Sequence, residues 1–168
     1  MKFKYLDKLA LLMSVVGLLV FIFGMIEQDI QLKHTIFLIS ALFLFFPPVM
    51  QKEPFFSGLQ TVVLISSSMT FLDISQKINL IVFIVSAVVF AAIFFVKNKI
   101  NLPQVFAFFG LLMLCLGIVI GSNIPMLISG LALAVYAIFS IRDGFSVAWA
   151  FLVLNLTVSS TAVYTLLF

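Results

Sequence analysis

Charged residues are scarce in this sequence: Asp, Glu, Lys and Arg make up 9% of it, against 64% hydrophobic residues. A soluble domain usually carries about 25% charged residues, and a chain of 168 residues could not hide this much apolar surface from water. Cysteine and histidine are represented by Cys115 and His34 alone, which excludes an internal disulfide, a cysteine-based metal cluster and a haem held by two histidines. The composition indicates a protein whose main partner is the lipid bilayer, with no nucleic-acid partner.

Catalytic and energy-coupling groups are also missing. No Asp, Glu, Lys, Arg or His lies deep in a long apolar run, and the sequence has no G-x-S-x-G nucleophile elbow, no H-E-x-x-H zinc helix and no P-loop. Proton-driven carriers and pumps usually need a buried ionisable relay. We therefore expect no catalytic residue, no metal site, no cofactor and no enzyme activity, and no energised transport by this chain alone.

Long apolar runs fill most of the chain. A bilayer core about 30 Å thick needs about 20 apolar residues per crossing helix. Runs close to this length occupy residues 9–26, 35–50, 54–72, 78–96, 102–121, 124–141 and 145–168. The separators are short, so nothing outside the runs is long enough to fold alone. The sequence predicts an all-α fold, a polytopic transmembrane helix bundle with seven spans that forms one integral membrane domain over residues 1–168.

Two of these runs have alternative interpretations. The run at 9–26 follows a basic start and could be a signal peptide, but it is longer than the usual apolar segment of about 7–15 residues and no small-residue cleavage site follows it. We interpret it as a retained helix. The run at 54–72 is diluted by Gln60 and by Ser and Thr side chains, and a buried or re-entrant segment there would leave six spans.

The basic residues decide between six and seven spans. With seven spans and an internal N-terminus, the inner segments hold Lys2, Lys4, Lys8, Lys52, Lys97, Lys99 and Arg142, and the outer segments hold Lys33 and Lys77. This asymmetry agrees with the positive-inside rule, and it disappears if the run at 54–72 does not cross. We expect a multi-pass protein of the cell inner membrane, with its N-terminus cytoplasmic and its C-terminus periplasmic or extracellular.

Short motifs recur between the two halves of the chain. Residues 11–13 and Gly17 reappear as residues 111–113 and Gly117, and residues 38–40 and 56–57 reappear as 127–129 and 145–146. This recurrence predicts two parallel three-helix repeats, residues 9–75 and 102–168, joined by a linker helix at 78–96 in a 3+1+3 layout. Chance is the alternative, because Leu-, Ile- and Phe-rich segments match one another easily. The layout resembles that of SWEET-type sugar carriers and nicotinamide-riboside carriers, but their signatures are missing, and layout alone carries no function.

Polar side chains gather on the third and seventh runs, which are equivalent in the expected repeat. Asn155 and Ser159 are four residues apart and share a helix face near mid-membrane, where polar groups should face other helices or a wet cavity. The repeat places Ser66 over Asn155. We expect a ligand-binding pocket that contains Ser67, Ser68, Thr70, Asn155 and Ser159. The alternative is packing, in which these groups bond to neighbouring helices or to their own helix backbone.

Two functions remain open at this point. The first is a non-energised pathway or carrier for a small neutral polar solute, which the uneven polar lining favours. The second is a non-catalytic integral subunit or envelope-maintenance factor that acts through helix–helix contacts with a larger membrane complex, which the absence of a charged site favours. Gly117 and Gly121 form a GxxxG pair that could join copies of the chain or a larger complex, although packing within one chain is the common use of such pairs.

Overall fold

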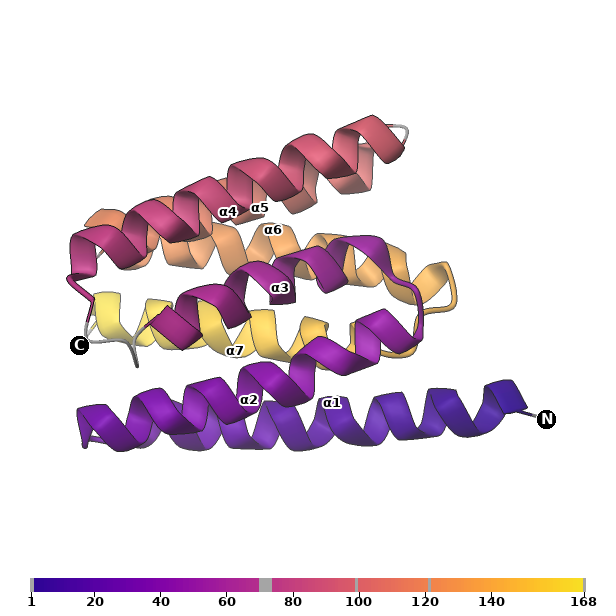
Figure 1. The fold of residues 1–168 in the computed structure, drawn as a ribbon, viewed down its shortest axis with the longest axis horizontal. Helices are drawn as coiled ribbons and strands as arrows, with labels where there is room; N and C mark the ends of the chain where they lie inside the picture. Colours follow the sequence, from indigo (N-terminus) through magenta and orange to yellow (C-terminus); the bar gives the residue numbers. More distant parts are fainter. Residues whose placement is uncertain (1, 70–73, 99, 121, 168) are drawn as a thin grey trace. The chain divides into compact units, whose positions relative to one another are not determined.

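The computed structural model describes residues 2–69, 74–98, 100–120 and 122–167 (Figure 1). These ranges contain seven helices and no strand, which confirms the all-α prediction. In chain order the helices are α1 (Lys2–Ile26), α2 (Ile30–Met50), α3 (Pro54–Met69), α4 (Gln76–Lys97), α5 (Leu102–Ile120), α6 (Asn123–Arg142) and α7 (Ala148–Leu167). Each helix covers most of one predicted apolar run.

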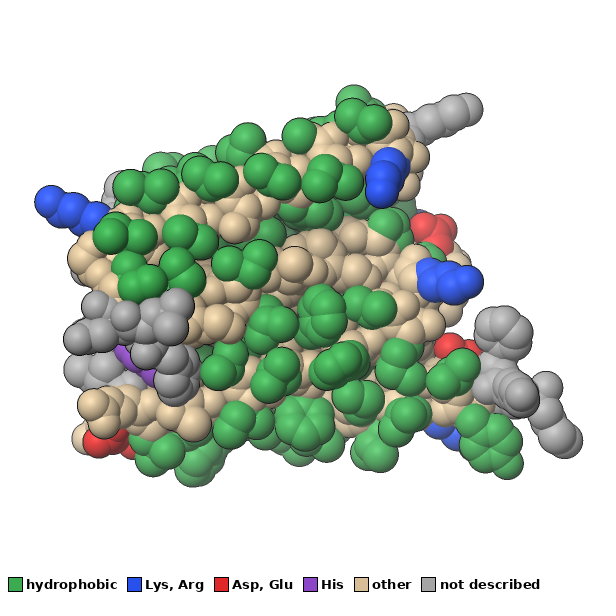
Figure 2. Space-filling model, viewed as in Figure 1, with side chains coloured by type: hydrophobic (Ala, Val, Ile, Leu, Met, Phe, Trp, Pro, Cys, Tyr) green, Lys and Arg blue, Asp and Glu red, His purple; other side chains and the backbone are tan. Residues whose placement is uncertain are grey.

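Several helices are suited to a lipid bilayer. Within the described residues, four apolar stretches are long enough to cross it, namely Tyr5–Gly24 in α1, Lys77–Lys97 in α4, Asn123–Arg142 in α6 and Ala148–Leu167 in α7. Two shorter apolar stretches, His34–Met50 and Leu102–Leu116, lie in α2 and α5. Hydrophobic side chains cover the sides of the helices, and charged side chains lie near helix ends (Figure 2). The protein is therefore helical and membrane-embedded.

The chain divides into two compact units, Met1–Phe90 and Ala91–Phe168, with the boundary inside α4. In the first unit, α2 packs against both α1 and α3. In the second unit, α6 packs against both α5 and α7. Each unit is thus built around its middle helix.

Glycine lets the first two helices of each unit approach closely. A Cβ atom built on Gly17 of α1 would lie 2.8 Å from Leu44 Cγ of α2, and one on Gly110 of α5 would lie 2.8 Å from Leu133 Cγ of α6. Since real Cβ atoms do not sit this close to a neighbour, both helix pairs depend on the missing side chain. Such small residues are typical where membrane helices meet. Ser40 of α2 adds a bond between helices, because its Oγ donates to the Gly17 carbonyl at 2.9 Å.

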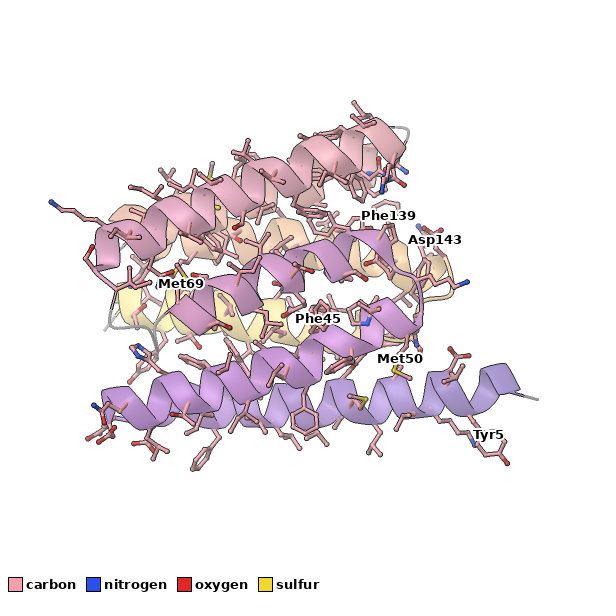
Figure 3. The ribbon with its side chains drawn as sticks, in the orientation of Figure 1. Tyr5, Phe45, Met50, Met69, Phe139 and Asp143 are labelled. Carbon is pink, nitrogen blue, oxygen red and sulfur yellow. The ribbon has the colours of Figure 1, made fainter. Side chains whose placement is uncertain are left out.

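The middle helix of each unit ends in the same kind of turn. After α2, the N–H groups of residues 51, 52 and 53 bond to carbonyls four, three and five positions back, and residues 143, 144 and 145 repeat this pattern after α6. The second residue of each turn is left-handed, with φ at 57° for Lys52 and 93° for Gly144. This is the Schellman arrangement, in which glycine is the usual left-handed residue. Figure 3 labels Met50 and Asp143 at these helix ends.

Capping side chains fix two helix starts in the first unit. Asp29 Oδ1 accepts from the Leu32 N–H at 2.8 Å before α2. Before α3, the Glu53 carboxylate accepts from the Phe56 N–H, and Pro54 occupies the first helical position, where an N–H is not needed. Glu53 is only 1% exposed, so the structure buries an acid that the sequence places in a short separator.

Candidate functional site

The seventh helix brings two of the expected ligand-binding residues together. Asn155 and Ser159 lie one turn apart on the buried face of α7, with 7% and 5% of their surfaces exposed. Ser159 Oγ donates to the Asn155 carbonyl at 2.9 Å and lies 3.5 Å from the Leu127 carbonyl of α6. Ser159 therefore lies in the contact between α6 and α7.

Gly130 of α6 is the residue that makes room for this contact. A Cβ atom built on Gly130 would overlap Ser159 Oγ and would lie 2.7 Å from the Asn155 backbone oxygen. The backbones of α6 and α7 approach closely at this point because Gly130 has no side chain to hold them apart. Ser159 thus takes part in the packing of α6 against α7.

The Asn155 amide keeps part of its bonding capacity. Its Nδ2 donates to the Phe151 carbonyl of the same helix at 2.8 Å. A side-chain amide carries two N–H donors and an oxygen with two lone pairs, so this one bond does not exhaust the group. Because Asn155 lies on the buried face of α7, its remaining N–H and its oxygen can bond only to a group inside the protein.

Most hydroxyls of α7 bond to their own helix. Thr157, Thr161 and Thr165 donate to the carbonyls four residues earlier, at 2.9, 3.0 and 3.1 Å. This i to i−4 bond satisfies a hydroxyl without any partner from another helix. The polar excess of α7 is therefore a weaker sign of a pocket than the sequence suggested.

On the third helix, the two described residues of the expected pocket differ in exposure. Ser68 is exposed and donates to the Leu64 carbonyl of its own helix at 2.8 Å, whereas Ser67 is half-buried. Thr70 lies outside the described residues. Ser66 Oγ donates to Asn79 Oδ1 of α4 at 2.9 Å, which joins these two helices in the first unit. The α3 and α7 sets belong to different units.

Gln60 is a buried polar residue that the sequence-based site does not include. It lies on the buried face of α3 with 4% of its surface exposed, beside Phe56 and Leu59. Its Oε1 has no hydrogen-bond partner among the described residues. A sequence signal was present, because Phe56, Leu59 and Gln60 have the same spacing and similar chemistry as Phe151, Leu154 and Asn155.

The expected contact through the GxxxG pair falls largely outside what the structure describes. Gly121 is outside the described residues, and Gly117 lies in α5 at a position whose surroundings are not described. Across the described ranges, no group of three or more His, Cys, Asp or Glu residues could hold a metal ion.

Comparison with known proteins adds no family to these observations. No protein-family model, curated protein or solved structure matches this chain.

Proposed function

We propose that the chain is a seven-span inner-membrane protein that provides a non-energised pathway for a small neutral polar solute. In this proposal each of α1 to α7 crosses the bilayer, with the N-terminus in the cytoplasm. The α3 helix, described over Pro54–Met69, rises about 24 Å at about 1.5 Å per residue and approaches the bilayer core in length. The excess of Lys and Arg on one side supports this orientation.

The buried amide of Asn155 is the observation that carries the functional proposal. One bond to the Phe151 carbonyl uses part of this amide, and a polar group buried in a membrane helix usually has an interaction that uses the rest. The group lies near the middle of α7 and offers both donors and an acceptor. Those properties suit an uncharged solute that carries hydroxyl or amide groups.

The distribution of charge supports a neutral solute and no energy coupling. In the described part of the chain, the charged side chains lie at or near helix ends, Glu53 included. An ion in the interior would therefore lose its hydration without a compensating charge. A proton relay would also need ionisable side chains at that depth.

A second function, that of a non-catalytic integral subunit, is favoured by a different observation. Large aliphatic side chains are exposed along α4, including Ile81, Val85, Val88 and Ile93. Lipid or another membrane protein could cover this face. Purification in a mild detergent from the native host separates the two functions, because a subunit elutes with a fixed partner and a pathway protein elutes without one.

Solute flux into proteoliposomes tests the proposed pathway. We expect the purified protein to raise glycerol or urea flux above that of empty vesicles, as measured by stopped-flow light scattering. Asn155→Leu should abolish the increase and leave the protein folded, because it replaces a buried amide with an apolar side chain of similar size. Thr161→Val is the matched control, since Thr161 is exposed on α7 and bonds only to its own helix. Unchanged flux in Asn155→Leu would reject the pathway.

A further inference from the structure

We propose that Gln60 of α3 is the counterpart of Asn155 of α7 in a duplicated three-helix unit, and that its amide binds the solute in the first unit. The inference rests on the proposed function and extends it to a residue and a ligand class. Its basis is a comparison of the internal geometry of the two units, each taken separately.

The middle helices of the two units have matching buried faces. When Ser40 of α2 is placed on Ser129 of α6, every buried residue described in α2 falls on a buried residue of α6. Leu44, which is 2% exposed, falls on Leu133, which is also 2% exposed. Both helices end in a Schellman turn, which in this register comes three residues later after α6 than after α2.

The first helices match through their glycine contacts. Gly17 faces Leu44 and Phe43 of α2, and Gly110 faces the residues that correspond to them in α6, Leu133 and Ala132. This contact pairs Gly17 with Gly110. The sequence motifs paired Gly17 with Gly117 instead, which lies about two helical turns further along α5. In the new register Gly24 falls on Gly117.

The third helices match through four consecutive buried positions. Phe55, Phe56, Leu59 and Gln60 are buried in α3, and residues 150, 151, 154 and 155 are buried in α7 at the same spacing. Phenylalanine falls on phenylalanine, leucine on leucine, and the Gln60 amide on the Asn155 amide. The register therefore places Gln60, rather than Ser66, on Asn155.

The Gln60 amide has a bonding need that the described chain does not meet. Its oxygen is buried and finds no donor, although buried polar atoms in proteins almost always have one. The neighbouring helical side chains Phe56 and Leu59 offer no donor. An N–H or O–H group from a bound molecule would satisfy the oxygen.

The chemistry of the two amides defines the class of ligand. An amide oxygen accepts from N–H or O–H groups, and an amide N–H donates to hydroxyl or carbonyl oxygens. Neither amide can compensate a full charge in an apolar helix. The ligand is therefore a small neutral molecule with N–H or O–H donors, such as a polyol or a urea-like amide.

Proteoliposome flux of glycerol and of urea tests the role of Gln60 with three variants. Gln60→Met removes the amide but keeps a side chain of similar length. Gln60→Asn keeps an amide, the group present at position 155 of the second unit. Thr61→Val is the control, because Thr61 is exposed and its hydroxyl bonds to the Ser57 carbonyl of its own helix. We expect flux to fall about fivefold to tenfold in Gln60→Met, as for one lost hydrogen bond, and to stay within about twofold of wild type in the other two.

Each outcome separates this inference from the proposed function. Wild-type flux no higher than that of empty vesicles rejects the proposed function and the inference with it. Full flux in Gln60→Met together with lost flux in Asn155→Leu keeps the function and overturns the inference. Equal loss in Gln60→Met and Gln60→Asn also overturns it, because side-chain shape would then matter and not the amide. Gln60→Met should melt no lower than wild type in detergent, and a lower melting temperature with lost flux assigns Gln60 to packing.

Discussion

Gly130 sets how closely α6 and α7 can pack. Because a Cβ atom there would lie 2.7 Å from the Asn155 backbone oxygen, Gly130→Ala must push the helices apart. We expect it to lower the free energy of unfolding by about 1–3 kcal/mol, as overpacked sites usually do. Thermal unfolding in detergent measures the change. Leu131→Ala on the exposed face of the same helix is the control, expected within about 0.5 kcal/mol of wild type. Equal stability of the two variants would contradict the close approach.

Lys52 and Gly144 test the turn that ends each middle helix. Both have a left-handed φ, which costs a residue with a side chain about 1–2 kcal/mol relative to glycine. Gly144→Ala should therefore destabilise the protein by about this amount, and Lys52→Gly should be more stable than Lys52→Ala. The comparison between the two Lys52 variants isolates the backbone effect, because both remove the same charge. If alanine and glycine are equally stable at position 52, the turn has a different conformation from the one described.

At the scale of the helix, the Ser40 hydroxyl, which bonds to another helix, can be compared with the equivalent hydroxyl of Ser129, which has no partner among the described residues. Ser40 Oγ donates to the Gly17 carbonyl at 2.9 Å, whereas Ser129 Oγ is buried and has no partner within the described residues. Ser40→Ala should cost about 0.6 kcal/mol, the average for such bonds in membranes. Ser129→Ala should be neutral or slightly stabilising, because it removes an unpaired polar atom. Unfolding titrations of both variants in detergent check this, and a larger loss in Ser129→Ala would show that its hydroxyl is bonded.

The sequence predicted the helices well because apolar runs of this length have few alternatives in lipid. Each of the seven runs contains one helix over most of its described residues, and the largest differences are at the ends, where α1 begins at Lys2 and not at residue 9. Charged residues can extend a helix beyond the bilayer core, so hydropathy marks the core and not the helix end. The α7 helix begins at Ala148 because residues 143–145 form the turn after α6 and a second turn follows, in which the Ala148 N–H bonds to the Phe145 carbonyl.

The candidate site was harder to predict because a hydroxyl can be satisfied without another helix. Ser68 and Thr157 count as polar in the sequence, yet both donate to carbonyls of their own helix. An amide side chain such as Gln60 is less easily satisfied in this way, but its burial depends on which face of α3 meets other helices. The repeat register was ambiguous for a similar reason: leucine triplets match at many offsets, whereas the described contacts of Gly17 and Gly110 are with corresponding residues of α2 and α6.

For the molecule as a whole, the division into two units and the positions of the basic residues both bear on the 3+1+3 arrangement of the helices. The boundary between units lies inside α4, which leaves three helices on each side of it, and each set of three is built around its middle helix. If α1 to α4 each cross the membrane once, equivalent helices of the two units have the same direction. The turns after α2 and α6, which share their hydrogen-bond pattern, then lie on one side of the membrane together with Lys52 and Arg142.

Single-cysteine labelling in intact cells and inverted vesicles tests this topology. In a Cys115→Ala background, Ser75→Cys before α4, Asn101→Cys before α5 and Asp143→Cys after α6 all lie at exposed positions and leave every Lys and Arg in place. With seven spans and a cytoplasmic N-terminus, Ser75→Cys should react only from outside, and Asn101→Cys and Asp143→Cys only from the cytoplasm. The reason is that α4 crosses the membrane between residues 75 and 101, and α5 and α6 cross it between residues 101 and 143. If α3 does not cross, all three positions exchange sides. Reaction of Ser75→Cys from the cytoplasm would thus reduce the spans to six and place the second unit in the opposite direction to the first.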